Sequence, residues 1–244
     1  MRYFIKFSYN GSNYHGWQIQ PNANTVQNEL QKCLSILLQK NIELVGAGRT
    51  DSGVHAKQMF AHFNYCENIK NDKIIYKLNS FLPNDIFVIQ IFKVKDQSHA
   101  RFSAVSRTYK YYISQKIDIF NPNVHVVRKD LNIEKMNKAS KHIVGEKDFT
   151  SFSKLHSETF TSICNVSIAL WEIQDDKLVF TITSNRFLRN MVRSIVGTLI
   201  DVGLSKIQER DLINIINKKD RSAAGVSAPA KALFITNISY PKNI

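Results

Sequence analysis

The chain has 244 residues, 43% of them hydrophobic, and its 33 Lys and Arg against 20 Asp and Glu give a formal net charge of +13. This composition excludes a collagenous or disordered chain, and the charge favours nucleic acid or an anionic membrane surface as a partner, although an ordinary Lys-rich surface would account for it equally well. Three widely spaced cysteines and the lack of a long apolar run exclude a disulfide framework, a zinc knuckle and a membrane span, so we expect a cytoplasmic protein without a secretory leader.

The first hundred residues alternate between strand and helix patterns. Alternating apolar and polar residues predict strands, whereas Thr25, in the N-cap position before an apolar stripe, predicts the start of a helix. Strands are expected at 2–9, 41–45, 59–65 and 86–94, and helices at 26–38 and 73–81. This β-α-β-β-α-β order is typical of a split, largely antiparallel α+β sandwich rather than of a doubly wound parallel sheet.

The second half has a similar order of elements. Strands are expected at 107–114, 162–173, 177–183 and 234–240, and helices at 133–144, 187–202 and 208–216. No low-complexity linker separates the halves. We therefore predict an α+β fold of two α/β subdomains, residues 1–105 and 106–244, which share a continuous, mainly antiparallel sheet and have a cleft where they meet.

The segment Gly46-Ala47-Gly48-Arg49-Thr50-Asp51-Ser52-Gly53-Val54-His55-Ala56 places a polar triplet on a loop between two apolar strands. Such loops often hold catalytic groups, because a rigid sheet positions them. Taken alone, the pattern favours a glycine-rich turn with a capping Asp, which is the commoner role of an Asp beside Gly. A phosphate-binding loop fits poorly, because a third glycine and a Gly-Lys-Ser/Thr are both missing.

This segment resembles GAGRTDAGVHA, the catalytic motif of the TruA family of tRNA pseudouridine synthases, with Ser52 replacing Ala. The resemblance extends along nearly the whole chain. Further matching segments read YNGSNYHGWQ (9–18), TVQ (25–27), HARFSA (99–104), RTYKY (107–111), GEKDF (145–149), FLRNMVR (187–193) and SAPA (227–230). One departure is Ala232, which stands where the family usually has Gly.

The resemblance implies a pseudouridine synthase fold and an isomerase that converts uridine to pseudouridine at positions 38–40 in the anticodon stem-loop of tRNA. It implies that Asp51, in the first subdomain, is the nucleophile and that Arg193, in the second, is its basic partner. Tyr109, also in the second subdomain, corresponds to the tyrosine that contacts the substrate. Arg49 is a weaker substrate-binding candidate, through a phosphate. We assign Tyr112, on the other face of the Tyr109 strand, to the core.

The reaction conserves atoms, so no cofactor is expected. His55 and His62 are expected to be structural or RNA-contacting, because no acidic partner stands at metal-ligand spacing. Members of the family act as homodimers, and we expect the contact at the 187–204 helix and the final strand. Candidate phosphate contacts are Lys110, Arg128, Lys129, Lys138, Lys141 and Lys147.

Three alternatives remain open. A non-catalytic RNA-binding protein would explain the charge and the tyrosines but would leave Asp51 without a role. A phosphoryl or glycosyl hydrolase would usually need a second carboxylate or a metal cluster, and no acidic pair stands near this loop. A pseudouridine synthase with another RNA target is the third.

Overall fold

A computed structural model describes residues 1–69, 71–154 and 160–244. They form two compact units. Unit 1 comprises Met1–Val105 and Phe234–Ile244, and unit 2 comprises Ser106–Leu233. The closing strand therefore belongs with the first hundred residues, whereas the sequence analysis grouped it with residues 106–233. Within unit 1 this strand is paired in parallel with the strand His55–Asn64.

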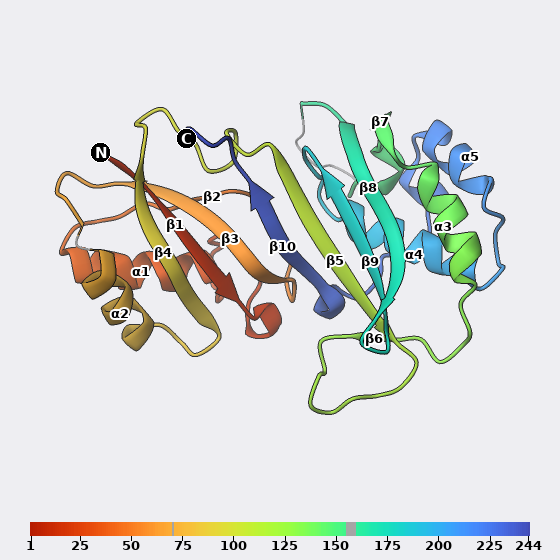
Figure 1. The fold of residues 1–244 in the computed structure, drawn as a ribbon, viewed down its shortest axis with the longest axis horizontal. Coiled ribbons are helices and arrows are strands. Elements are labelled where there is room, and N and C mark those ends of the chain that lie inside the picture. The colour runs from red at the N-terminus through yellow and green to blue at the C-terminus, as the bar shows by residue number, and fades with distance from the viewer. Residues whose placement is uncertain (70, 155–159) are drawn as a thin grey trace. The chain divides into compact units, whose positions relative to one another are not determined.

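Unit 1 is a sheet covered by two helices (Figure 1). Its strands run in the order β4-β1-β3-β10, with β2 paired to β3. The strands are β1 (Arg2–Tyr9), β2 (Val45–Gly46), β3 (His55–Asn64), β4 (Ile86–Val94) and β10 (Leu233–Ser239). All pairs are antiparallel except β3 with β10. The helices are α1 (Val26–Leu38), which Thr25 caps as predicted, and α2 (Asn71–Phe81), which packs on α1 and β4.

Unit 2 repeats the plan of a sheet with helices. Its strands run in the order β5-β9-β8-β7, all antiparallel, and β6 pairs in parallel with β5. The strands are β5 (Ser106–Ser114), β6 (His125–Val126), β7 (Gly145–Asp148), β8 (Ile163–Gln174) and β9 (Lys177–Ser184). The helices are α3 (Ile133–Lys141), α4 (Met191–Gly203) and α5 (Asp211–Lys218). The predicted mainly antiparallel α+β architecture is thus confirmed within each unit.

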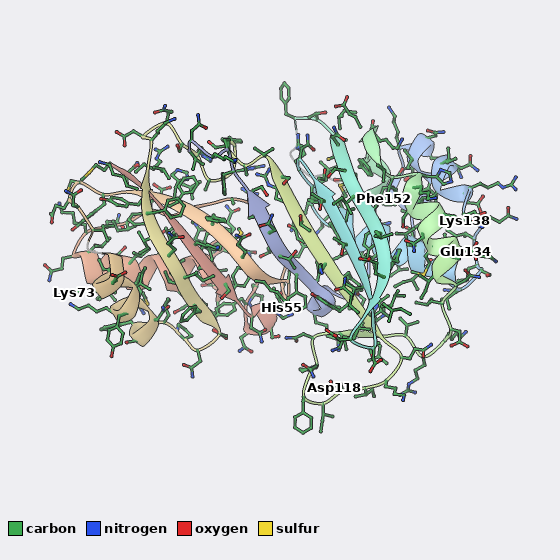
Figure 2. All side chains as sticks on the ribbon, viewed as in Figure 1. His55, Lys73, Asp118, Glu134, Lys138 and Phe152 are labelled. Atoms are coloured by element: carbon green, nitrogen blue, oxygen red, sulfur yellow. The ribbon has the colours of Figure 1, made fainter. Side chains whose placement is uncertain are left out.

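Helix α4 forms the centre of unit 2. Every residue of it is buried except Arg193 and Asp201. Its apolar side chains are already buried within one chain, which leaves little of α4 for the dimer contact that the sequence analysis expected at the 187–204 helix and the final strand; that contact stays a prediction. By contrast, α3 has an exposed face, where Glu134 and Lys138 form an ion pair of 2.9 Å (Figure 2). Lys138 is thus already paired with a carboxylate, which weakens it as a phosphate contact.

Candidate active site

The loop that carries Asp51 joins β2 to β3. Asp51 is half-buried and Arg49 is exposed. The backbone turns back after the aspartate, where the N–H of Val54 donates to the carbonyl of Asp51 at 3.2 Å. Gly53 has a φ of 78°, a conformation that strains residues with a Cβ. The loop is therefore a tight turn that presents a carboxylate at the end of a rigid strand.

A second segment, residues 9–18, holds this loop in place. The hydroxyls of Tyr9 and Thr50 are hydrogen-bonded at 2.9 Å, and the Trp17 N–H donates to the Thr50 carbonyl at 3.4 Å. The Tyr14 carbonyl accepts from the Gly53 N–H at 3.3 Å and from the Ser52 hydroxyl at 3.2 Å. Residues on both sides of Asp51 are thus fixed by one neighbouring segment. The YNGSNYHGWQ motif acts as the support of the Asp51 loop.

The side chain of Tyr14 ties this support to the start of β4. Its hydroxyl donates to a carboxylate oxygen of Asp85 at 2.5 Å, and the side-chain amide of Asn13 donates to the other oxygen at 3.1 Å. Burial raises the pKa of the Tyr14 phenol, and the hydrogen bond to Asp85 adds to the rise. Tyr14 therefore stays a neutral donor, and both Asp85 oxygens are used in positioning the loop. Sequence reasoning missed this link, because 71 residues separate its two ends.

The contact between the two segments is so close that Gly16 has no room for a side chain. Its φ is +92°, and an added Cβ would lie 2.3 Å from the Thr50 carbonyl oxygen. We expect Gly16→Ala to lower the free energy of unfolding by about 2–4 kcal/mol, since it combines backbone strain with overpacking. Displacement of Thr50 should also move the neighbouring Asp51.

The matched control is Gly48→Ala on the same loop, where an added Cβ meets nothing within 4 Å. Urea unfolding should place this variant within about 0.5 kcal/mol of the wild type. Equal loss of stability in both variants would contradict the close-packing explanation.

His55 and His62 both serve the fold of unit 1. His55, at the start of β3 (Figure 2), is 1% exposed; its Nδ1 accepts the Gly11 N–H at 3.0 Å, and its ring stacks on Phe234. His62 is 5% exposed and its Nδ1 accepts the Ala100 N–H at 3.2 Å. Among the described residues, no group of three or more His, Cys, Asp or Glu could hold a metal ion. Nor does this part of the chain contain a helix long and apolar enough to cross a membrane.

His62 makes the stability of the protein depend on pH. Burial, with the positive charges of His99 and Arg2, lowers the pKa of His62 to about 4. The folded value lies below the unfolded value of about 6.5, so the unfolded chain takes up the proton first. The contribution to stability is therefore complete above pH 6.5 and is lost as the pH falls toward 4.

We expect the free energy of unfolding to fall by about 2 kcal/mol between pH 7 and pH 5, at about 1.4 kcal/mol per pH unit below 6.5. In His62→Asn, the amide oxygen can still accept the Ala100 N–H but nothing at this position titrates. Urea unfolding at both pH values should show a much smaller pH dependence for this variant. An unchanged dependence would assign the effect to other groups.

In unit 2, β5 carries Tyr109 and Tyr111 on one face. Tyr109 is half-buried, and its ring meets that of Phe187 edge to face, with 5.0 Å between the ring centres. Tyr111 is fully buried, whereas Tyr112 is half-buried. The core assignment of Tyr112 was therefore wrong. The face that Tyr109 and Tyr111 share carries the fully buried ring, and Tyr111 pairs across the sheet with buried Phe180 of β9.

Arg193 stands in the first turn of α4 and is half-buried. Its side-chain Nε donates to the Ala228 carbonyl at 2.8 Å, and its backbone carbonyl accepts the Ala228 N–H at 3.0 Å. Burial raises the pKa of the Tyr111 phenol, while the positive charge of Arg193 opposes that rise. Arg193 is thus a half-buried charged side chain that the Ala228 carbonyl holds near the Tyr111 phenol.

The predicted site residues fall into two groups. Asp51 and Arg49 lie on one loop of unit 1, and Tyr109 and Arg193 lie in unit 2. The pairing of Asp51 with Arg193 stays a prediction. Sequence reasoning missed Tyr111 and the segment at Ala228 that binds Arg193; the SAPA motif was the only signal for the latter.

Comparison with known proteins gives matches along the length of the chain. A family model described as tRNA pseudouridine synthase matches residues 6–103 and 139–241. The chain is 50% identical over 241 residues to tRNA pseudouridine synthase A of Azobacteroides pseudotrichonymphae, covering 98% of this chain and 97% of that protein. It is 48% identical over 247 residues to the enzyme of the same name from Bacteroides thetaiotaomicron, covering 100% and 92%. A relative of that name from Buchnera aphidicola is 40% identical over 236 residues, covering 96% and 89%.

Proposed function

The chain belongs to the tRNA pseudouridine synthase family, and we propose that it isomerises uridine to pseudouridine at positions 38–40, in the anticodon stem-loop of tRNA, with Asp51 as the nucleophile. The observation that carries this proposal is the position of Asp51. It is a half-buried carboxylate on a tight loop that a second segment holds on both sides. A turn-capping Asp would need no such support.

The reaction breaks the N1–C1′ bond of the uridine, turns the base and forms a C5–C1′ bond. The proton on C5 is lost and N1 gains one, so that atoms and electrons balance without a redox partner. A carboxylate nucleophile divides this exchange into easier steps through a covalent intermediate. Asp51 can attack either C6 of the base or C1′ of the sugar, and both routes require its ionised form.

Arg193 is proposed to keep that carboxylate ionised. An opposite charge within a few ångströms favours the charged form of an acid. Arg193 suits this role because its Nε is bound to the Ala228 carbonyl, which fixes the plane of the guanidinium. We propose that Asp51, Arg193 and Tyr109 act on the same uridine.

Tyr109 is proposed to stack on the uridine after the base has left its helix. Base–aromatic stacking contributes about 1–3 kcal/mol, which offsets much of the cost of unstacking. We expect Tyr109→Leu to lose about tenfold or more in single-turnover rate. Tyr109→Phe should retain binding of the flipped base, and if the hydroxyl takes part in removing the C5 proton, this variant should stall after the covalent step.

Single-turnover kinetics on one anticodon stem-loop, with both variants side by side, measures these rates. A wild-type rate for Tyr109→Leu would rule out the stacking role. Covalent complex trapped on a denaturing gel distinguishes a late stall from slow entry of the base.

Further expectations concern assembly and location. We propose that the protein works in the cytoplasm as a homodimer in which one tRNA touches both copies. Its net charge of +13 supports contact with phosphates, for which Lys141 and Lys147 are candidates. Arg49 is exposed on the Asp51 loop and is proposed to contact a phosphate near the target nucleotide.

The test is to incubate the protein with tRNA transcripts and map pseudouridine at each position. Product at positions 38–40, in the presence of EDTA and without added nucleotide, is the expected result. Product elsewhere in the tRNA would correct the target, and uridine left intact in every transcript would refute the activity. Sedimentation of the free protein tests the dimer independently.

A further inference from the structure

We propose that Tyr111 is a positioning residue for Arg193. Its buried hydroxyl anchors the segment 225–229, whose Ala228 carbonyl holds the guanidinium of that arginine. The inference rests on the proposed function, because Arg193 matters here through its role beside Asp51. It concerns a residue that does not itself touch the substrate.

The segment 225–229 runs directly against helix α4. An added Cβ on Gly197 would lie 1.7 Å from the Val226 carbonyl oxygen, so only a glycine allows this approach. The Gly225 N–H donates to the Thr198 hydroxyl at 2.9 Å. The Ala228 N–H donates to the Arg193 carbonyl at 3.0 Å. Backbone and helix are therefore in contact along several residues.

The same segment fixes the arginine side chain. Nε of Arg193 donates to the Ala228 carbonyl at 2.8 Å, while the backbones of the two residues are also bonded. The guanidinium is planar, so one bond at Nε sets the direction of both terminal nitrogens. A shift of the Ala228 carbonyl would consequently turn the charged end of Arg193.

Tyr111 binds the carbonyl of the residue that follows Ala228. Its hydroxyl donates to the Pro229 carbonyl at 3.1 Å and lies 3.1 Å from Nδ1 of His125. The phenol has one proton, so both bonds form together only when His125 donates from Nδ1. Gain or loss of a proton at the other ring nitrogen of His125 would leave this arrangement intact.

The hydrogen bond between Tyr111 and Pro229 is well placed to hold this segment, because Tyr111 is buried and the backbone at Pro229 is restricted. Tyr111 is 0% exposed, so water cannot easily replace its hydroxyl if that is removed. Pro229 restricts its own φ and the conformation of Ala228 before it. The position of the Pro229 carbonyl is thereby transmitted to the Ala228 carbonyl one residue away.

Ser227 provides a second anchor on the other side of Ala228. Its hydroxyl accepts from the side-chain amide of Asn190 at 2.7 Å and from Nη2 of Arg221 at 3.0 Å. The carbonyl that holds Arg193 therefore lies between two side-chain anchors. Ser227→Ala tests the same idea without altering the core.

The experiment compares Tyr111→Phe, Ser227→Ala and Tyr3→Phe as full-length proteins. Tyr3→Phe is the matched control: Tyr3 is also buried and its hydroxyl also donates to a backbone carbonyl, that of Glu67 at 3.0 Å, but in unit 1. Single-turnover rates of pseudouridine formation are measured from pH 5 to pH 8 on one anticodon stem-loop, together with its affinity.

We expect Tyr111→Phe to lose about tenfold in rate at pH 6, because small misplacement of a catalytic group is costly. The acidic limb of its pH–rate profile should move to higher pH, since a misplaced positive charge stabilises the nucleophile's ionised form less. Affinity should stay within about twofold, and Ser227→Ala should change in the same direction.

Wild-type rates and profiles for both Tyr111→Phe and Ser227→Ala would overturn the inference. An equal loss in Tyr3→Phe, or a loss without movement of the acidic limb, would also overturn it by showing general destabilisation. If Tyr111→Phe does not fold, Ser227→Ala decides alone. A wild-type protein that forms no pseudouridine would instead refute the proposed function.

Discussion

Replacing Asp51 by Asn is expected to abolish pseudouridine formation, with a single-turnover rate at least about a thousandfold below the wild type. The amide keeps the size of the side chain and the loop around it but cannot act as the nucleophile. Affinity for tRNA should stay within about tenfold, because contacts to phosphates dominate binding. Filter binding and quantitative pseudouridine mapping on the same transcript measure the two effects separately.

The control for this variant is Asp176→Asn. Asp176 is exposed in the turn between β8 and β9 and has a φ of 60°, which Asn tolerates well. This control should retain wild-type activity. Substantial activity in Asp51→Asn would remove the nucleophile assignment, and a parallel loss of affinity would indicate a collapsed loop instead.

Much of the fold follows from local patterns in the sequence. The alternation over 2–9 gave β1 at its observed bounds, and Thr25 capped α1 where its side chain predicted. These elements depend on hydrogen bonds and burial that neighbouring residues determine. The ends of helices were harder to predict where an unusual backbone conformation sets them. Helix α4 begins at Met191 rather than at 187, because Asn190 before it has a φ of 66°.

Short strands and pairings between distant segments could not be predicted from the sequence. The strand predicted at 41–45 is only Val45–Gly46, and the short strand β7 at 145–148 was missed because it has no apolar alternation. The last strand, β10, was assigned to the wrong group of residues, since nothing local indicates that it pairs with β3.

For the candidate site, motifs identified residues but not their supports. The alternation along β5 correctly placed Tyr109 and Tyr111 on one face, but only tertiary packing decides which face is covered, so Tyr111 rather than Tyr112 is buried. The same limit hid the link between Tyr14 and Asp85. Side chains that position a loop are often bonded to residues far away in the sequence, so no spacing pattern predicts which residues they are.

Arg193→Met is expected to lower the single-turnover rate about a hundredfold, a loss typical of removing one preorganised electrostatic contact at an active site. Methionine keeps an unbranched apolar chain in a half-buried position, so the packing of α4 should be little changed. Without the positive charge, the ionised carboxylate of Asp51 is less favoured, and the acidic limb of the pH–rate profile should move to higher pH. The rate of Arg193→Lys should lie between those of the wild type and Arg193→Met. Lysine keeps the positive charge but lacks the guanidinium, whose Nε donates to the Ala228 carbonyl.

The control is Arg210→Met, which removes an exposed charge at the start of α5 and should leave both rate and profile unchanged. If Arg193→Met has the wild-type rate and the wild-type pH–rate profile, Arg193 does not stabilise the ionised form of Asp51. In that case the rate of Tyr109→Leu distinguishes the two remaining explanations. If Tyr109→Leu is also fully active, the uridine must bind elsewhere. If Tyr109→Leu is slow, Tyr109 keeps its proposed role at the uridine, and Asp51 depends on another cation, for which Arg49 on its own loop is the nearest in sequence.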